Sequence, residues 1–192
     1  MFLLCLPEVN EVRVVTVLPP HLHIVGDSML RGISNIHKAT VDMLPGANIA
    51  RVTQHLDRMH FDIIIRMQVL LIWVGTNNHT SPLEKVKEDY VALFHVLRQR
   101  FSKKAIFFVG LLPRPRDVQV TQPWVTQVNR WLRSAVRRIG HRFIPLTHLV
   151  QTRQGVIDHS LYRDGLHLSP KGSLVVRDHL RNRLKALFPP HH

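Results

Sequence analysis

The chain has 192 residues, enough to bury a substantial hydrophobic core within one domain. Its 26 lysine and arginine residues against 13 aspartate and glutamate residues give a net charge of +13. That excess favours nucleic acid, an anionic membrane or an acidic protein as a partner, although a basic surface without a specific partner is an equally good interpretation. The single cysteine excludes an internal disulfide framework. The apolar runs are too short to cross a bilayer, and we see no signal peptide, so we expect a cytoplasmic protein.

Apolar strands and helical segments alternate through the first half of the chain. We predict a short strand over 21–26, which ends at a glycine, and a helix over 28–37. A second strand over 41–44 precedes an amphipathic helix over 49–58. The segment 61–74 is the most β-prone part of the chain, and its nearly all-apolar sequence predicts a strand of a parallel sheet that is covered on both faces.

The second half continues the alternation with longer helices. Ser81 and Glu84 form a capping box around Pro82, which predicts the start of a helix. Apolar residues then recur at spacings of three and four, so one face of this helix should be buried. That face carries Leu83, Val86, Tyr90, Phe94, Leu97 and Phe101. A buried strand is predicted to follow over 105–111.

Two more helices and a fifth strand complete the predicted elements. Pro123 is expected to open a helix, and a short strand should follow over 142–146. Ser169 and Pro170 repeat the pattern of a cap followed by proline and predict the start of the last helix. The inner face of the helix after Pro123 is expected to carry Trp124, Val128, Trp131, Leu132, Ala135, Val136 and Ile139.

This order of elements predicts an α/β fold, in which a five-stranded and mostly parallel sheet lies between two layers of helices. We expect a single domain over 1–192, with its core at about 21–188. Ligands of such sheets bind at the carboxyl ends of the strands. Ser28, Gly46 and Asn77 each follow a predicted strand end, so the sequence places chemically useful groups at this edge.

A serine, an aspartate and a histidine together are the parts of a hydrolase that attacks an ester with a serine. A serine hydroxyl is a poor nucleophile until a base removes its proton, and His167 is the candidate base for Ser28. Asp164 precedes His167 by three residues on the same predicted loop, where it can fix the imidazole tautomer and stabilise the imidazolium. We therefore predict Ser28, Asp164 and His167 as the catalytic residues.

Such an attack turns the ester carbonyl into an oxyanion, which needs fixed hydrogen-bond donors. The candidate donors are the backbone N–H groups of Ser28 and Gly46 and the side-chain amide of Asn77. Glycine at position 46 lets the backbone approach the substrate closely. The sequence therefore predicts an oxyanion hole at the same edge of the sheet.

Each of these residues also has a purely structural interpretation. Ser28 suits a helix cap, Gly46 after a proline suits a turn, and Asn77 suits a strand-to-helix loop. Asp164 precedes a glycine, which is a common turn pair, and a lone loop histidine such as His167 is usually only solvated. The catalytic interpretation is favoured because these residues lie, in this order along the chain, in four short segments. Each segment is placed at a predicted strand end or just before a predicted helix.

Other patterns of histidine are weaker. Asp158 and His159 compete as an acid–imidazole pair, but adjacent residues of an extended chain point in opposite directions. His21 and His23 can share one strand face, yet no cysteine, aspartate or glutamate completes a convincing zinc set. We expect no metal and no cofactor.

The four short segments that contain these residues resemble the sequence blocks of the SGNH, or GDSL-type, serine hydrolase superfamily. The similarity runs from about residue 23 to about residue 187. The family serine matches Ser28, its glycine matches Gly46, and its asparagine matches Asn77. Its closing Asp-x-x-His matches Asp164 and His167. The resemblance implies a flavodoxin-like three-layer fold, no metal, and hydrolysis of carboxylic esters with acetyl or lipid acyl groups.

Narrower similarities exist within that superfamily. The segments 73–79 and 110–114 resemble the catalytic subunits of intracellular platelet-activating-factor acetylhydrolase. The block around Gly46 and the closing segment 164–169 are more similar to esterase domains of some vertebrate retrotransposons and their genomic relatives. The family often has aspartate after its asparagine, and Asn78 stands there in this chain, which removes no catalytic group.

Three functions stay open on this reading. The first is a serine esterase that forms an acyl-enzyme on Ser28. Arg66, Met67 and Gln68 interrupt the predicted strand before Asn77, however, and a distorted strand there would displace Asn77 and abolish activity.

The second function is a catalytically weak or inactive module on the same fold that binds nucleic acid or anionic lipid through a basic surface. Two clusters would form that surface: Arg130, Arg133, Arg137 and Arg138, then Arg177, Arg181, Arg183 and Lys185. The third is a degenerate member of the family that is kept for oligomerisation. For it, the resemblance to acetylhydrolase subunits implies a homodimer.

Overall fold

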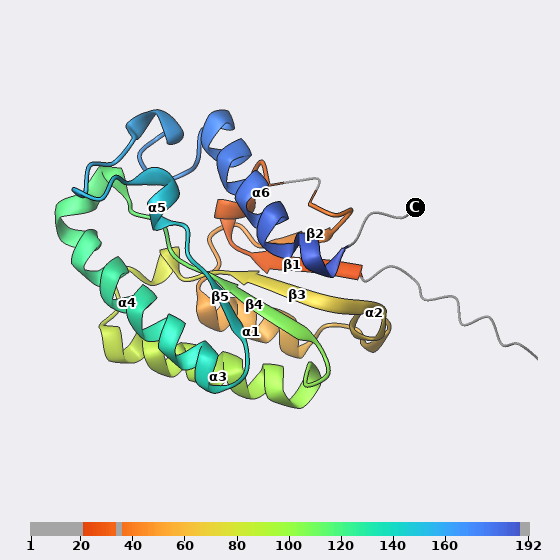
Figure 1. The fold of residues 1–192 in the computed structure, drawn as a ribbon. Helices are drawn as coiled ribbons and strands as arrows, with labels where there is room; N and C mark the ends of the chain where they lie inside the picture. The colour runs from red at the N-terminus through yellow and green to blue at the C-terminus, as the bar shows by residue number, and fades with distance from the viewer. Residues whose placement is uncertain (1–20, 34–35, 189–192) are drawn as a thin grey trace, which may run out of the picture.

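The computed structural model describes residues 21–33 and 36–188, and its centre is a five-stranded sheet (Figure 1). The strands are β1 (His21–Gly26), β2 (Thr40–Met43), β3 (Met67–Trp73), β4 (Ala105–Val109) and β5 (Arg142–Ile144). They lie in the order β2-β1-β3-β4-β5, and every neighbouring pair runs parallel. The predicted α/β sandwich is confirmed, and its strand order is that of flavodoxin-like folds.

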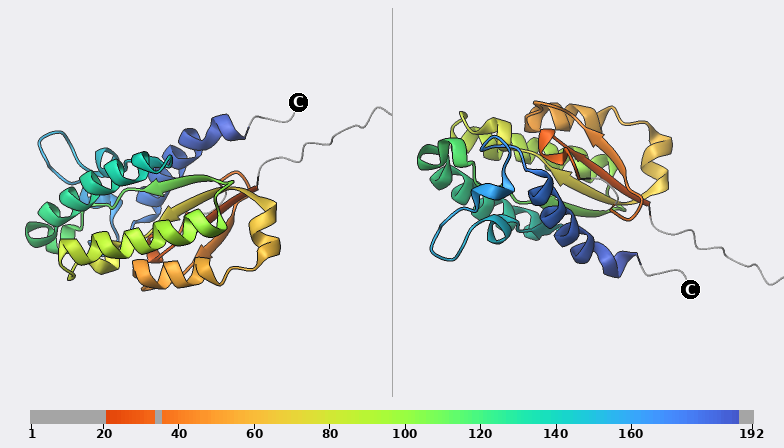
Figure 2. Two further views of the ribbon diagram at one scale, coloured as in Figure 1. Left: turned by 90° about the horizontal axis from the view of Figure 1, so that it is seen from below. Right: turned by 90° about the horizontal axis from the view of Figure 1, so that it is seen from above.

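Helices cover both faces of the sheet. The longer helices are α1 (Ile49–Asp57), α2 (Phe61–Arg66), α3 (Leu83–Arg100), α4 (Val118–Arg138), α5 (Thr147–Val150) and α6 (Pro170–Leu184). Side chains of α1, α3 and α4 pack on one face and those of α5 and α6 on the other. Figure 2 shows the sheet between α6 on one side and α1 and α3 on the other. Within the described residues, no helix is both long and apolar enough to cross a membrane.

The side chains of β3, the central strand, alternate between two hydrophobic clusters. Leu70 and Ile72 pack with α1, α3 and α4, whereas Leu71 and Trp73 pack with α5 and α6. All four side chains are fully buried. Because both faces of β3 are packed, the carboxyl end of the strand and the loop that follows it have a rigid base.

The structure corrects the prediction of one long strand over 61–74. Residues 61–66 form α2, and only Met67–Trp73 belong to β3. β3 pairs with β1 from His21 onward and with β4 from Ala105 onward, so the isoleucines before Met67 meet no neighbouring strand in the described chain. A helix satisfies their backbone hydrogen-bonding groups internally, which explains why it forms despite their β propensity.

The interruption around Gln68 is a register shift at the amino end of β3. It lies opposite the step from His21 to Leu22 in β1. Beyond it, β3 pairs regularly with β1 as far as Trp73, and with β4 as well. The irregularity is therefore confined to the end of the strand that is remote from Asn77.

The helix predicted over 28–37 is also wrong. In the described part of this range, the 3-10 turn η1 (Ser28–Leu30) is the only helical element after β1. Gly32 then adopts a φ of +80°, which is incompatible with continuing a right-handed helix. Residues 34 and 35 of the predicted helix lie outside the described residues.

Two helix starts differ from the predictions, and one agrees. α3 begins with Pro82 in the cap position, so the predicted cap by Ser81 is wrong. α4 begins at Val118, ahead of Pro123, after the short turn η3 (Pro115–Asp117). The cap predicted for α6 is confirmed, because Ser169 Oγ accepts a hydrogen bond from the N–H of residue 172 at 3.1 Å.

Candidate active site

Ser28 follows β1, the strand at which the strand order of the sheet reverses. β1 lies between β2 and β3, and sheets with this strand order bind their ligands beyond the carboxyl ends of the strands where the order reverses, here β1 and β3. Asp27 caps η1, because its Oδ1 accepts a hydrogen bond from the Met29 N–H at 2.9 Å. The cap holds Ser28 at the first position of η1, half-buried.

Ser28, His167 and Asp164 form one continuous chain of hydrogen bonds. Ser28 Oγ lies 3.1 Å from His167 Nε2. His167 Nδ1 lies 2.8 Å from Asp164 Oδ2. The structure therefore brings together the three side chains selected from the sequence, although 139 residues separate Ser28 from His167.

The loop around His167 holds Asp164 as an anion. The hydrogen bond from the His167 side chain lowers the pKa of Asp164 most, and the backbone N–H groups of His167 and Leu166 lower it further. An ionised Asp164 accepts the Nδ1 proton of His167, which leaves Nε2 free to take a proton from a neighbour. The Arg163 N–H closes this loop by donating to the His167 carbonyl at 2.8 Å.

The segment that contains Gly46 is fastened to the turn η2 (Thr76–Asn78), which follows β3. Asn77 Nδ2 donates to the Ala47 carbonyl at 2.9 Å. Asn78 Oδ1 accepts a hydrogen bond from the Ile49 N–H at 3.0 Å and so satisfies the start of α1. These two hydrogen bonds place Gly46 and Asn77 on adjoining loops at the carboxyl edge of the sheet.

Several hydrogen-bond donors in these loops are available to a ligand. Among the described residues, the backbone N–H groups of Ser28 and Gly46 have no hydrogen-bond acceptor. Asn77 donates one of its two amide hydrogens to the Ala47 carbonyl, and the other amide hydrogen remains available as a donor. Gly46 adopts a φ of +69°, which a residue with a side chain adopts only under strain, so glycine is required there for its conformation.

A buried arginine that the sequence analysis did not select braces the Asn77 loop. Arg114, in the loop after β4, is only 5% exposed. Its Nη1 donates to the Thr76 carbonyl at 3.0 Å. Its Nε and Nη2 donate to the two carboxylate oxygens of Asp117 at 3.1 and 2.7 Å. The only sequence signal for Arg114 is its place in the segment 110–114, where the chain resembles acetylhydrolase subunits.

The same loop also holds the segment that carries His167. The Arg116 N–H donates to the Gly165 carbonyl at 3.0 Å. The Tyr162 hydroxyl donates to the Pro113 carbonyl at 2.9 Å. The loop after β4 thus contacts both the loop of Asn77 and the loop of His167, and it fixes the distance between them.

Asp27 is a second carboxyl group beside Ser28, in surroundings opposite to those of Asp164. It is fully buried, and its Oδ2 has no hydrogen-bond partner among the described residues. Burial raises the pKa of Asp27 to about 7, against the lowering effect of the Met29 N–H. Near neutral pH this carboxyl group is therefore partly protonated.

The competing polar pairs have other partners. Asp158 caps the turn η4 (His159–Leu161), and its Oδ1 accepts a hydrogen bond from the Ser160 N–H at 2.9 Å. His21 Nε2 lies 2.9 Å from Thr40 Oγ1, and His23 Nε2 lies 3.0 Å from Asp42 Oδ2. In the part of the chain that the structure describes, no group of three or more histidine, cysteine, aspartate or glutamate side chains is placed to hold a metal ion.

Known sequences are similar to this chain over most of the described fold. The model of the GDSL-like Lipase/Acylhydrolase family matches residues 24–174. Human platelet-activating factor acetylhydrolase IB subunit alpha1 is 32% identical over 130 residues, which cover 65% of this chain and 54% of that protein. The chain therefore spans about half the length of the curated relatives it matches.

Solved structures share the fold at low sequence identity. A Streptococcus pneumoniae protein named after platelet activating factor has a TM-score of 0.72 at 16% identity, over 90% of this chain and 87% of that one. The OSK domain of Drosophila Oskar has a TM-score of 0.67 at 14% identity, over 84% and 87%. Because the family match extends from β1 into α6 and includes Ser28, Asn77 and His167, the chain belongs to the GDSL-like lipase/acylhydrolase family.

Proposed function

We propose that this protein is a carboxylic ester hydrolase, in which Ser28 is the nucleophile, His167 the general base and Asp164 the residue that orients His167. The observation that carries the proposal is the hydrogen-bonded chain from Ser28 to Asp164, with distances of 3.1 and 2.8 Å. Membership of the GDSL-like lipase/acylhydrolase family supports the same chemistry.

The proposed reaction begins when His167 Nε2 takes the proton of Ser28 as Oγ bonds to the carbonyl carbon of the ester. The carbonyl oxygen becomes an oxyanion, for which the N–H groups of Ser28 and Gly46 and the remaining amide hydrogen of Asn77 are the proposed donors. Asp164 stabilises the imidazolium that forms. The bond from the carbonyl carbon to the alcohol oxygen then breaks, and His167 gives its proton to the departing alcohol.

The acyl group is left on Ser28 as an ester. A water molecule attacks its carbonyl carbon while His167 takes one proton from that water, and the same donors stabilise the second oxyanion. The bond to Ser28 Oγ breaks, His167 returns the proton to Oγ, and the carboxylic acid leaves. The cycle needs no metal or cofactor, because all proton transfers pass through His167.

The substrate class that we infer is an ester of an acetyl or lipid acyl group. The human relative is named an acetylhydrolase, and the family name covers lipases and acylhydrolases. Hydrolysis of p-nitrophenyl esters from acetate to octanoate would measure the preferred acyl length. A preference for acetate would favour a small acyl site, and a preference for octanoate would favour lipid esters.

The direct test is hydrolysis of p-nitrophenyl acetate and butyrate by the wild-type protein and by Ser28→Ala. We expect the substitution to lower kcat by at least about 1000-fold, because no other group replaces the nucleophile. Ser134→Ala is the matched control, since Ser134 lies on the exposed side of α4 and, among the described residues, its Oγ forms a hydrogen bond only with Arg138, at 3.2 Å. Unchanged hydrolysis in Ser28→Ala would refute the proposal.

A second function is favoured by the outer face of α4. Arg130, Arg133 and Arg137 are exposed there, and none forms an ion pair with an acidic side chain among the described residues. In the other basic cluster, by contrast, Arg177 and Arg181 share Asp178, at 2.9 and 3.8 Å. Given the net charge of +13, we also propose that the face of α4 binds nucleic acid through its phosphates.

Fluorescence anisotropy with a labelled 20-nucleotide RNA tests this second proposal. Binding should weaken steeply between about 50 and 200 mM NaCl, and the double variant Arg130→Gln/Arg137→Gln should reduce the salt dependence. Lys87→Gln is the control, because Lys87 is already paired with Glu84 at 2.6 Å. RNA binding that is absent at 50 mM NaCl, or that does not respond to salt, would contradict it.

A further inference from the structure

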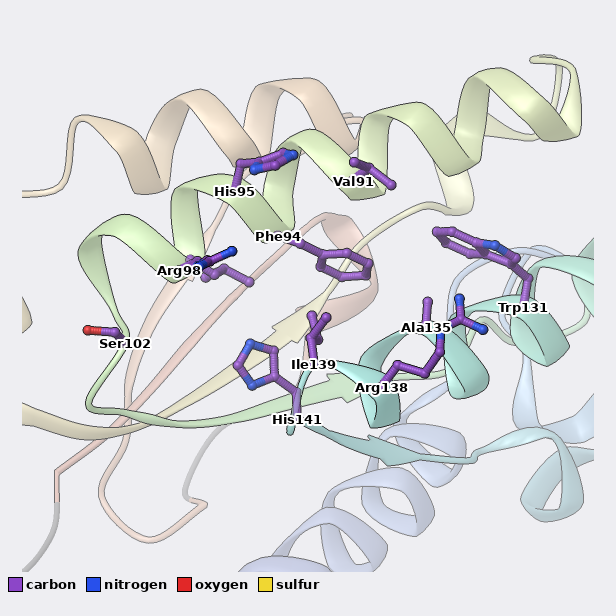
Figure 3. Close-up of a pocket in the computed structure, with 11 residues that line it drawn as sticks. Val91, Phe94, His95, Arg98, Ser102, Trp131, Ala135, Arg138, Ile139 and His141 are labelled. Atoms are coloured by element: carbon purple, nitrogen blue, oxygen red, sulfur yellow. The ribbon is translucent and has the colours of Figure 1, made fainter.

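A groove of about 640 Å³ lies between the carboxyl-terminal halves of α3 and α4 (Figure 3). We call it the α3–α4 groove, and Phe94 and Arg98 of α3 and Trp131 and Arg138 of α4 line it. Its volume is within the range of about 300 to 1,000 Å³ that is typical of sites for small molecules. α3 and α4 lead into the amino ends of β4 and β5, whereas Ser28 follows the carboxyl end of β1, so the groove is separate from the candidate active site.

The floor of the groove is aromatic and well packed. Phe94 meets Phe108 of β4 edge to face, with 5.5 Å between ring centroids, and stacks on Trp131 at 6.3 Å. The ring of His141 lies nearly parallel to Phe108 at 6.3 Å. Figure 3 shows Phe94 and Trp131 extending from the two helices into the space between them. Rings held in this way offer a preformed apolar surface.

The mouth of the groove is also apolar. Val91 and Ile139 line it and expose 43% and 44% of their surface. Ile139 was expected on the inner face of its helix, and this prediction is wrong. Ala135 stands one helical turn from both Trp131 and Ile139, and its small side chain leaves room between them. Large apolar side chains exposed around an apolar hollow indicate a ligand with an apolar body.

The charged side chains of the groove are cationic. Arg98 and Arg138 line it, and no aspartate or glutamate does so within the described residues. In that same part of the chain, Arg98 forms no hydrogen bond or ion pair, and Arg138 contacts only the hydroxyl of Ser134. Guanidinium groups recognise carboxylates and phosphates by paired hydrogen bonds. The charge complementary to this groove is therefore an anion beside an apolar chain.

We propose that the α3–α4 groove binds an anionic amphiphile with a single apolar chain. The chain lies on the aromatic floor of Phe94 and Trp131, and the anionic head pairs with Arg98 and Arg138. A neutral lipid would leave both arginines without a partner, and a small anion would leave the aromatic floor exposed. The proposal is independent of ester hydrolysis, because no residue of the groove belongs to the loops around Ser28, Asn77 and His167.

Calorimetric titration of the full chain with three ligands that each carry one chain of about twelve carbons tests the proposal. Laurate and dodecyl phosphate carry anionic heads and should bind, whereas dodecyltrimethylammonium should bind at least about tenfold more weakly. Tighter binding of laurate would identify a carboxylate as the preferred head, and tighter binding of dodecyl phosphate a phosphate. Equal binding of the cationic amphiphile would overturn the proposal, because the arginines would then have no role.

Substitutions locate the site. Arg98→Gln/Arg138→Gln should weaken laurate binding at least tenfold. The matched double variant Arg130→Gln/Arg137→Gln removes two positive charges of α4 outside the groove, and it should leave laurate binding unchanged. Ala135→Phe fills the groove and should also weaken binding. If Ala135→Phe fails to fold, the exposed arginine variants still decide the matter, and unchanged affinity in Arg98→Gln/Arg138→Gln would overturn the proposal.

Two further readouts exclude other occupants and other sites. Methyl NMR should show shifts on laurate binding at Ala135 and Ile139; shifts at Met29 alone would place the ligand near Ser28 and overturn the proposal. Sedimentation of the ligand-free protein should give the same mass for wild type and Ile139→Asp. A dimer that dissociates in Ile139→Asp would assign the groove to a second copy of the chain instead.

Discussion

The two ends of the sheet carry surfaces of different kinds. At the carboxyl end, polar side chains are fastened to one another and to the backbone, as Asn77 is to Ala47 and Asp164 is to His167. At the amino end, the α3–α4 groove offers a volume of about 640 Å³ beside Arg98, which has no partner among the described residues. Groups that are already paired are pre-oriented for chemistry, whereas unpaired charge beside apolar surface is suited to binding.

This contrast explains why cavity volume alone does not locate the candidate active site. The donors and acceptors around Ser28 are defined by hydrogen bonds of 2.7 to 3.1 Å, and they need little empty space. If the contrast is right, substitutions at the carboxyl end should reduce turnover. The variant Arg98→Gln/Arg138→Gln at the amino end should leave kcat unchanged.

After the loss of the proposed nucleophile in Ser28→Ala, the largest expected effect on turnover is that of Asp164→Asn. The amide cannot hold the His167 tautomer that exposes a free Nε2, so we expect kcat for p-nitrophenyl acetate to fall by about 10⁴-fold. Asp158→Asn is the control, because Asp158 caps η4 and contacts Ser160 rather than His167. Similar kinetics in the two variants would show that Asp164 has no role in orienting the base.

Loss of the amide donor should have the next largest effect. Asn77→Ala removes the proposed oxyanion contact together with the hydrogen bond to Ala47, and we expect kcat to fall by about 100- to 1000-fold. Asn48→Ala is the matched control, since Asn48 caps the adjoining helix α1 through the Arg51 N–H at 2.9 Å. It should lower stability by about 1 kcal/mol and leave kcat within a few-fold of wild type. A loss of activity in Asn48→Ala equal to that in Asn77→Ala would mean that loop order, not a donor, is what matters.

A smaller effect on turnover is expected at Arg114, which supports the loops around the candidate active site and is not proposed to contact the substrate. Arg114→Met removes the hydrogen bond to Thr76 and leaves Asp117 without its cation, so both loops lose support. We expect kcat to fall by about tenfold with little change in KM, and unfolding to become easier by about 3 kcal/mol. Arg116→Gln should change neither, because the contact of Arg116 with Gly165 is made by its backbone N–H. Wild-type kcat in Arg114→Met would show that the brace serves stability alone.

The sequence was sufficient to find Ser28, Asp164 and His167 because each lies in a short motif tied to a strand or helix end. The five strands were found for a similar reason, since a buried parallel strand is a short apolar run. The helix formed by residues 61–66 could not be predicted in this way. Its isoleucines favour a strand locally, and they form a helix because no described strand lies beside them.

Arg114 and the α3–α4 groove were missed because both arise from tertiary packing. The burial of Arg114 comes from three loops that meet above the sheet, and no local pattern in the segment 110–114 encodes that meeting. The groove depends on the small side chain of Ala135 and on the exposure of Ile139, which the helical period placed on the inner face. Periodicity predicts which face is apolar, but it does not predict how completely a neighbour covers that face.

The smallest effect on activity is expected at Asp27, the second carboxyl group beside Ser28. Burial raises its pKa from the ordinary value to about 7. Between about pH 4 and pH 7 the folded protein therefore holds a proton that the unfolded chain releases, and this group makes stability fall as the pH rises through that window. Asp27→Asn keeps an oxygen for the Met29 N–H, so kcat should change less than about threefold.

Urea unfolding at pH 4 to 8 distinguishes the two carboxylates. Relative to wild type, Asp27→Asn should gain stability progressively between about pH 4 and pH 7, by up to about 1.4 kcal/mol for each pH unit. Asp164 has a lowered pKa, so its contribution is present above about pH 4 and is lost as the pH falls, and Asp164→Asn should differ from wild type mainly above that pH. If Asp27→Asn instead parallels wild type at every pH, the pKa of Asp27 is the same in the folded protein as in the unfolded chain. The contrast between the buried carboxyl group of Asp27 and the exposed carboxylate of Asp164 would then fail.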